Sequence, residues 1–421
     1  MKKLLQLLTA DTRVSDYKID IHRKESYELF FVKGKLETMR STDTCDKEVT
    51  IYADHDGVRG DSQFFVYPST TGKEMEKLIR DAVQKALLIN NQPFTLPGAE
   101  TGHFTVESDF SSRSAGDLAA AISKVVFDAN QIPSGSLNSV EVFVNKHTEQ
   151  ILNSRGLDKT QVRYDAMVEA IPTYNGSEQS VELYEQYNFG SLDVEALRGE
   201  ISQKMEQVKA RYEAQAPAEE LSCPVVLNIQ EISELMWEIA WDLNYSTVYS
   251  RSNLFKKGDA IQKEILGDPI SITMVGQVPG CVRSRCFDSD GLSLGSVRLV
   301  ESGRAANYFG ANRFGQYLEE VPTGSLPCLC LDPGSARMPD GQWLEVISMS
   351  GLQVDFYNDY IGGEIRLAYL HSPEGTQPIT GISISGSISE ALNKLRLSAD
   401  TATFGGYKGP KKAILEGMRI F

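Results

Sequence analysis

From Pro224 to its C-terminus, the chain consists mostly of short strand-like runs separated by turns that contain glycine. This pattern is typical of an antiparallel sheet or a barrel-like domain. Helix-like segments are expected at only two places, residues 230–243 and 387–397. The expected strands include residues 270–275, 294–301, 343–349, 352–358 and 364–371. We therefore predict a C-terminal antiparallel, barrel-like β domain with few helices.

The N-terminal half mixes strand-like and helix-like segments, which predicts an α+β domain. The strand-like runs are residues 17–22, 27–32, 48–53, 62–67, 139–145, 161–171 and 180–189, and the helix-like runs are 74–89, 114–129 and 194–214. A group of strands followed by a helix recurs, which hints at an internal repeat.

A chain of 421 residues is too long for one ordinary hydrophobic core. The stretch that most resembles a linker runs from residue 215 to 223. We predict an N-terminal α+β domain over residues 1–214, with a possible subdivision near residue 100. The linker of residues 215–223 and a β-rich domain over residues 224–421 follow.

Composition excludes several classes of protein. A net charge of −15 argues against direct binding to nucleic acid, which depends on clustered lysine and arginine. Six cysteines are too few for a disulfide scaffold. No apolar run approaches the ~18 residues of a membrane span, and the first ten residues are read as an opening helix rather than a signal peptide. We expect a cytoplasmic protein.

A short apolar run at residues 224–228 leads directly into an amphipathic helix. Its apolar side chains recur at helical spacing, so one face is expected to pack inward. These side chains are Ile232, Leu235, Met236, Ile239, Ala240 and Leu243, and the opposite face carries Glu231, Glu234, Trp237, Glu238, Trp241 and Asp242. A strand followed at once by such a helix is the most informative local pattern in the chain.

This segment and several later ones resemble the TldD/PmbA family, historically called modulators of DNA gyrase. The other matching elements are Ile151 with Asn153-Ser154-x-Gly156, then Phe287-Asp-Ser-Asp-Gly-Leu, Val300-Glu-Ser-Gly, Thr323-Gly and Pro378-Ile-Thr-Gly-Ile-Ser-Ile-Ser-Gly. In the family's peptidase branch the helix carries His-Glu-x-x-x-His, in which two imidazoles bind zinc and the glutamate is the general base. In this sequence Trp237, Glu238 and Asp242 occupy those positions.

The resemblance therefore implies the TldE/PmbA-like branch, which lacks the metal motif. Indole offers no lone pair to a metal ion. The family's remaining ligand, a cysteine near the C-terminus, is also absent, because no cysteine follows Cys330. Without a cation, water keeps a pKa near ~15.7 rather than about 7, and Glu238 alone cannot activate it. We expect no catalytic residue, metal or cofactor on this chain, with Trp237, Glu238 and Asp242 as vestiges of the motif.

Other side-chain groups have simpler explanations. Glu234, Glu238 and Asp242 could bind a hard cation, but a solvated acidic face is the more common use. Trp237 and Trp241 could fill the former metal cavity or contact a partner, although packing within the domain is expected. Cys281, Cys286, Cys328 and Cys330 lack zinc-knuckle spacing and are interpreted as buried thiols. His147-Thr-Glu149 only faintly resembles a zinc-deaminase signature, so that function is rejected.

By resemblance, such a chain pairs with a His-Glu-x-x-x-His subunit, TldD-like, in a metallopeptidase complex that acts on unfolded peptides. Zinc would lie on the partner, and this chain could hold extended peptide by strand addition. Two alternatives stay open. The chain could be a metallopeptidase itself, with Asp242 and Glu238 joined by His371 or Cys330, or a self-associating homo-oligomeric scaffold. No contact with a membrane or directly with nucleic acid is expected.

Overall fold

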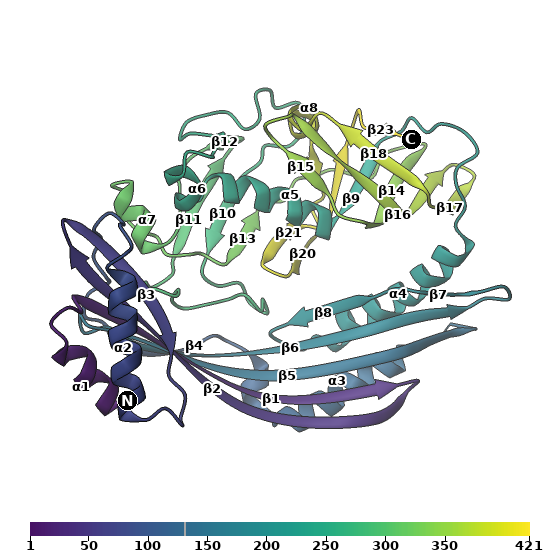
Figure 1. Cartoon of the computed structure of the whole chain (residues 1–421). Helices are drawn as coiled ribbons and strands as arrows, with labels where there is room; N and C mark the ends of the chain where they lie inside the picture. The colour runs from purple at the N-terminus through teal and green to yellow at the C-terminus, as the bar shows by residue number, and fades with distance from the viewer. Residues whose placement is uncertain (130–131) are drawn as a thin grey trace.

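The computed structural model describes residues 1–129 and 132–421. Within the N-terminal half, eight strands form one sheet in the order β3-β2-β1-β5-β6-β4, with β7 and β8 also paired to β6. The strands are β1 (Asp16–Val32), β2 (Lys35–His55), β3 (Val58–Phe65), β4 (Thr101–Thr105), β5 (Gly135–Asn153), β6 (Asp158–Asn175), β7 (Ser180–Glu182) and β8 (Glu185–Phe189). The segments before and after residue 100 thus belong to a single sheet, which curls strongly (Figure 1).

The long strands of this sheet are longer than their apolar runs suggest. Strand β1 joins the two runs expected at residues 17–22 and 27–32, and it pairs with β2 from Asp16 to Val32 with one irregularity at Phe30. Residues 23–26 are polar, but ladder hydrogen bonds come from the backbone and do not require apolar side chains. The run expected at 180–189 is instead two short strands, β7 and β8.

Helices cover one face of the curled sheet. They are α1 (Lys2–Ala10), α2 (Gly72–Ala86), the 3-10 turn η1 (Asp109–Ser112), α3 (Ala115–Asp128) and α4 (Val194–Glu213). Helix α2 starts at a capping box, in which the Thr71 hydroxyl accepts from the Glu74 amide and the Glu74 carboxylate accepts from the Thr71 amide. Two hydrophobic clusters result, one under α1 and α2 and one under α3 and α4.

The opposite face of the curled sheet is polar, and it faces the C-terminal half (Figure 1). Side chains alternate between the two faces of a strand, so Lys18 and His22 share this face. Register then places Glu149, opposite His22, on the same face. Lys18 Nζ donates to the carbonyl of Ser289, 2.7 Å away, which shows that the face meets the C-terminal half. We call this surface the concave face.

The C-terminal half contains two further sheets, in the orders β12-β11-β10-β13-β21-β20 and β19-β22-β9-β14-β16-β18-β23, with β15 and β17 also paired to β16. The strands of the first are β10 (Ile272–Val275), β11 (Ser296–Glu301), β12 (Arg304–Ala305), β13 (Cys328–Leu331), β20 (Thr401–Phe404) and β21 (Tyr407–Pro410). The strands of the second are β9 (Val225–Asn228), β14 (Trp343–Met349), β15 (Gln353–Asp355), β16 (Tyr360–Ser372), β17 (Gly375–Ile379), β18 (Ile382–Gly386), β19 (Arg396–Leu397), β22 (Lys412–Leu415) and β23 (Arg419–Ile420). Most pairs are antiparallel, but β13 with β21 and β14 with β9 are parallel. The predicted α+β class and β-rich C-terminal half are confirmed.

One hydrophobic core serves both C-terminal sheets. Helix α5 (Ile229–Asp242) lies in it, and the smaller helices are α6 (Tyr245–Tyr249), α7 (Asn312–Tyr317) and α8 (Ile388–Lys394). The apolar face predicted for α5 is buried in this core; Met236, for example, clusters with Ile272 and Val346 from the two sheets. Burial of each such side chain contributes about 1.5–3 kcal/mol. Packing therefore fixes which face of α5 points outward.

Polar contacts join the concave face to the C-terminal half. Lys159 is fully buried, and its Nζ donates to the carbonyl of Gly291 at 3.1 Å and to the hydroxyl of Ser293 at 2.7 Å. The same ammonium lies 2.6 Å from the Glu100 carboxylate. Gln161 accepts from the amide of Cys286 at 2.8 Å. These contacts fix the segment around residues 286–293 against the sheet.

Candidate functional site

Helix α5 presents the motif positions on its outer face. Glu238 is exposed, and partial burial raises its pKa above the ordinary value. Asp242 is half-buried at the end of the helix, and Trp237 is also half-buried. No histidine lies on this helix. Glu238 therefore has no imidazole beside it on α5 with which it could share a metal ion.

The carboxylate of Asp242 already has a structural role. Oδ1 accepts from the amide of Leu254 at 2.7 Å, and Oδ2 accepts from the amide of Phe255 at 2.9 Å. Burial raises the pKa of Asp242, and these two backbone donors only partly offset it. Both oxygens thus fix the loop that follows α6. Glu234, the other acid on this face, accepts from the amide of Leu352 at 3.3 Å, so the three acids are not simply a solvated face.

The two tryptophans of α5 differ in their surroundings. Their ring centroids are 6.1 Å apart. Trp237 packs against the C-terminal core, and the Arg283 guanidinium lies over its ring at 5.8 Å. Trp241 is 54% exposed. Packing within the domain therefore accounts for Trp237 but not for Trp241.

A fourth acid of α5, Glu231, faces the interior. Its side chain is buried, and its Oε2 has no hydrogen-bond partner in the structure. Burial raises the pKa of Glu231 to about 7. This carboxyl lies in the first turn of the helix, where the partial positive charge of the helix N-terminus favours an anion. Burial outweighs that effect here.

The alternative ligands named from the sequence do not gather around Glu238. His371 stacks on the Trp343 ring at 3.9 Å, and its Nε2 lies 2.8 Å from the Glu345 carboxylate. Cys330 lies on β13, near the buried pair Cys281 and Cys328, whose sulfur atoms are 3.5 Å apart. Across residues 1–129 and 132–421, no group of three close donor atoms includes Glu238, Asp242, His371 or Cys330.

One such group does exist in the described chain, on the concave face. It consists of His22, His147 and Glu149, whose donor atoms lie within 4.8 Å of one another. His22 Nε2 is 2.9 Å from His147 Nδ1, and the rings stack with centroids 5.2 Å apart. His22 Nε2 is 4.0 Å from Glu149 Oε1. His147 is buried, and the His22 side chain is 43% exposed.

Neighbouring charges hold this group in place. Asp165 Oδ2 lies 2.8 Å from His147 Nε2 and 2.8 Å from Arg163 Nη1. Burial opposes the charge on Asp165, but its contacts with His147, Asn145 and Arg163 outweigh burial and lower its pKa to about 2. Burial also opposes the charge on Glu149, yet Arg163 and Arg285 lower its pKa. Burial lowers the pKa of His22.

Sequence reasoning missed this group for a structural reason. His147 and Glu149 were noticed only as part of a deaminase pattern, and the strand was expected to end at residue 145. Strand β5 continues to Asn153, so the two side chains lie on one face, two residues apart. His22 is 125 residues earlier and comes beside them only through the β1–β5 register. The one available signal was His-x-Glu in a strand.

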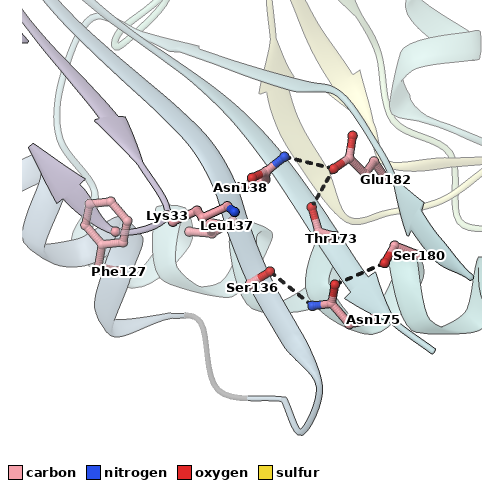
Figure 2. Close-up of a pocket in the computed structure, with 10 residues that line it drawn as sticks. Lys33, Phe127, Ser136, Leu137, Asn138, Thr173, Asn175, Ser180 and Glu182 are labelled. Carbon is pink, nitrogen blue, oxygen red and sulfur yellow. Dashed lines mark hydrogen bonds between the residues drawn. The ribbon is translucent and has the colours of Figure 1, made fainter. Parts of the chain in front are cut away.

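A pocket of about 490 Å³ lies at the end of the curled sheet where the β1–β2 turn, the start of β5 and the end of β6 meet (Figure 2). Its polar side chains bond to one another. Asn138 donates to Glu182 at 3.0 Å, and Ser180 donates to Asn175 at 3.1 Å. Glu182 also accepts from Thr173 at 3.4 Å. The Thr173 hydroxyl is buried and its contact with Glu182 is long, while Asn138 already donates to the same carboxylate oxygen, so we do not take this pocket as a catalytic candidate.

Comparison with known proteins agrees with this architecture. Residues 220–420 match the sequence model of the PmbA/TldA metallopeptidase C-terminal domain. A Thermotoga maritima protein described as a proposed modulator of a DNA gyrase has a similar structure. It is 15% identical with a TM-score of 0.79, over 100% of this chain and 99% of that chain. TldE from Thermococcus kodakarensis is 14% identical with a TM-score of 0.79, over 99% of both chains.

A third similar structure, described as a proposed modulator of DNA gyrase, comes from Bacteroides thetaiotaomicron. It is 14% identical with a TM-score of 0.78, over 100% of this chain and 98% of that chain. No curated protein matches the sequence significantly. The match assigns residues 220–420 to the C-terminal domain of the PmbA/TldA metallopeptidases, and the whole chain has the fold of these structures. None of its described helices is long and apolar enough to cross a bilayer.

Proposed function

We propose that this chain is a non-catalytic, TldE-like subunit of a cytoplasmic metallopeptidase complex that acts on unfolded peptides. The main support for the proposal is the set of side chains that helix α5 presents at the motif positions. Trp237 and Asp242 stand where the peptidase branch has histidines, and both carboxylate oxygens of Asp242 accept backbone hydrogen bonds. A TldD-like partner with an intact His-Glu-x-x-x-His helix would supply the zinc ion and the general base.

The contribution of this chain would be to hold extended peptide. Strand β2 pairs with β1 from Lys35 to Tyr52, but with β3 only from Glu48 onward. Within the described residues, the outer backbone edge of residues 35–46 therefore has no partner strand. An open edge of this kind can accept an extended peptide through main-chain hydrogen bonds, and such an edge would bind unfolded chains without sequence preference.

The test is an assay of peptide cleavage with and without a TldD-like subunit from the same cell. The isolated chain should not cleave an unstructured peptide, whereas the complex should cleave it in a chelator-sensitive manner. Glu238→Gln in this chain should leave the activity of the complex unchanged, and the equivalent change in the partner's motif should abolish it. Cleavage by the isolated chain would overturn the proposal.

The peptide-holding role has its own measurement. The affinity of an unstructured peptide should be weaker for the partner alone than for the complex, and it should be measured with the partner's general base removed so that no cleavage occurs. Equal affinity in the two cases would rule out a contribution of this chain to substrate binding.

A further inference from the structure

We propose that His22, His147 and Glu149 bind one first-row transition-metal dication of the zinc class on the concave face. This site would be separate from the family's motif position on α5 and independent of the proposed function. Two imidazoles and one carboxylate form a ligand set that zinc accepts, and three protein ligands leave a fourth position open to water or to a carboxylate.

All donor atoms of the group lie within 4.8 Å of one another, and the two pairs that involve His22 are near the spacing around a bound ion. Ligand atoms about 2.0–2.1 Å from a tetrahedral ion lie roughly 3.3 Å from one another. The nitrogen atoms of His22 and His147 are 2.9 Å apart, and His22 Nε2 is 4.0 Å from Glu149 Oε1. The first pair must open by a few tenths of an ångström and the second must close by somewhat more. Rotation of the half-exposed His22 ring can supply much of both movements.

Asp165 prepares His147 for this role. Its carboxylate lies 2.8 Å from His147 Nε2, close enough for charge attraction but not aligned for a hydrogen bond. The nearby negative charge favours the tautomer with a proton on that nitrogen. The lone pair is then on Nδ1, which faces His22. Carboxylates that orient a metal-bound histidine in this way typically change metal affinity 10–100-fold. Neither histidine needs to leave its strand to bind the ion.

Two arginines oppose the cation and limit its affinity. Glu149 Oε1 accepts from Arg163 Nε at 3.0 Å, and Glu149 Oε2 lies 3.7 Å from Arg285 Nε. The same carboxylate accepts from Gln161 at 2.8 Å. A metal ion must compete with these partners for Glu149. We therefore expect affinity in the micromolar range rather than that of a closed structural zinc site.

The site would also be coupled to helix α5 through one short loop. Arg285 approaches Glu149, while Arg283, two residues earlier, lies over the Trp237 ring at 5.8 Å. Binding of a dication would repel Arg285 and so bias the position of this loop. The side chain of Trp237 gives a fluorescence signal for that change, although Trp241 and Trp343 add background.

The experiment titrates metal-free protein with Zn²⁺ by calorimetry and with Co²⁺ by visible absorption. The wild type should bind one equivalent and give the intense absorption of low-coordinate Co²⁺. His22→Ala and His147→Ala should each weaken binding at least tenfold, and Asp165→Asn should weaken it 10–100-fold. His103→Ala is the matched control, because His103 is an exposed strand histidine outside the group, and it should bind as the wild type does.

A charge change separates this site from unspecific binding. Arg285→Gln should tighten Zn²⁺ binding severalfold by removing a nearby positive charge. Because His22 is half-exposed, His22→Ala should fold normally, which circular dichroism checks. Equal Zn²⁺ affinity of the wild type and a folded His22→Ala variant, or no Zn²⁺ binding by the wild type, would overturn the proposal. These readouts measure metal binding alone, so they succeed or fail separately from the cleavage assays.

Discussion

Helix α5 and the concave face of the curled sheet make opposite use of metal-binding side chains. On α5 the motif position survives in sequence, but its acids are occupied or isolated: Asp242 fixes a loop and Glu238 has no imidazole nearby on its helix. On the concave face no motif is visible in sequence, yet His22 and His147 bring two imidazole nitrogens within 2.9 Å. A sequence motif on a helix thus indicates where metal ligands could lie, but close donor atoms can gather elsewhere in the fold without any motif.

The largest effect of a single substitution is expected where the concave face meets the C-terminal half. Lys159→Ala should lower the free energy of unfolding by about 3 kcal/mol, because it removes a buried ammonium that serves three partners. Lys159→Met is the matched control; it keeps the apolar stem and should cost about half as much. Urea denaturation measures both. A change below about 0.5 kcal/mol for Lys159→Ala would show that the contact does not hold the two halves together.

The buried acid of α5 gives a pH-dependent prediction. The pKa of Glu231 is raised from 4.5 to about 7, so the folded protein binds this proton more tightly than the unfolded chain. The stability that the protein gains from protonated Glu231 is therefore fully present below about pH 4.5 and is lost as the pH rises to about 7. The loss should be roughly 2–4 kcal/mol.

Glu231→Gln removes that titration. The difference in unfolding free energy between wild type and variant should shift in favour of the variant between pH 4.5 and pH 8, as measured by urea denaturation at several pH values. A difference that stays constant with pH would mean that Glu231 is ionised at little cost in the folded protein. Such a result would mean that the surroundings of Glu231 stabilise its negative charge better than its burial indicates.

A smaller effect distinguishes the two acidic residues at the motif positions. Asp242→Ala should destabilise the protein by about 1–2 kcal/mol, because two backbone amides lose a carboxylate acceptor. Glu238→Ala should change stability by less than about 0.5 kcal/mol, since Glu238 is exposed. Asp242→Asn keeps one acceptor and should lie between them. If Glu238→Ala were the more harmful change in thermal denaturation, the structural role given to Asp242 would be wrong.

Much of the architecture could be predicted from sequence because it depends on local pattern. The apolar spacing of α5 predicted its bounds within one residue, and the run at residues 343–349 is strand β14 itself. Glycine-containing turns indicated the β-rich C-terminal half. The long strands of the curled sheet were underestimated, because polar residues such as 23–26, which lie on both faces of β1, interrupt the apolar pattern without interrupting the backbone ladder.

The candidate site was harder to predict for a related reason. The ligand set of His22, His147 and Glu149 depends on the register between β1 and β5, and register over 125 residues of separation cannot be read from spacing. The hydrogen bonds of Asp242 to Leu254 and Phe255 depend likewise on how a loop returns to its helix. The sequence does show directly that no histidine lies on the helix that carries Glu238.

The most direct test is cleavage of an unstructured peptide by the isolated chain after saturation with Zn²⁺, compared with Glu238→Gln. We predict no cleavage by either protein, including when the concave face is loaded with metal, and cleavage once a TldD-like subunit is added. Chelator-sensitive cleavage by the isolated wild type that disappears in Glu238→Gln would contradict a non-catalytic role.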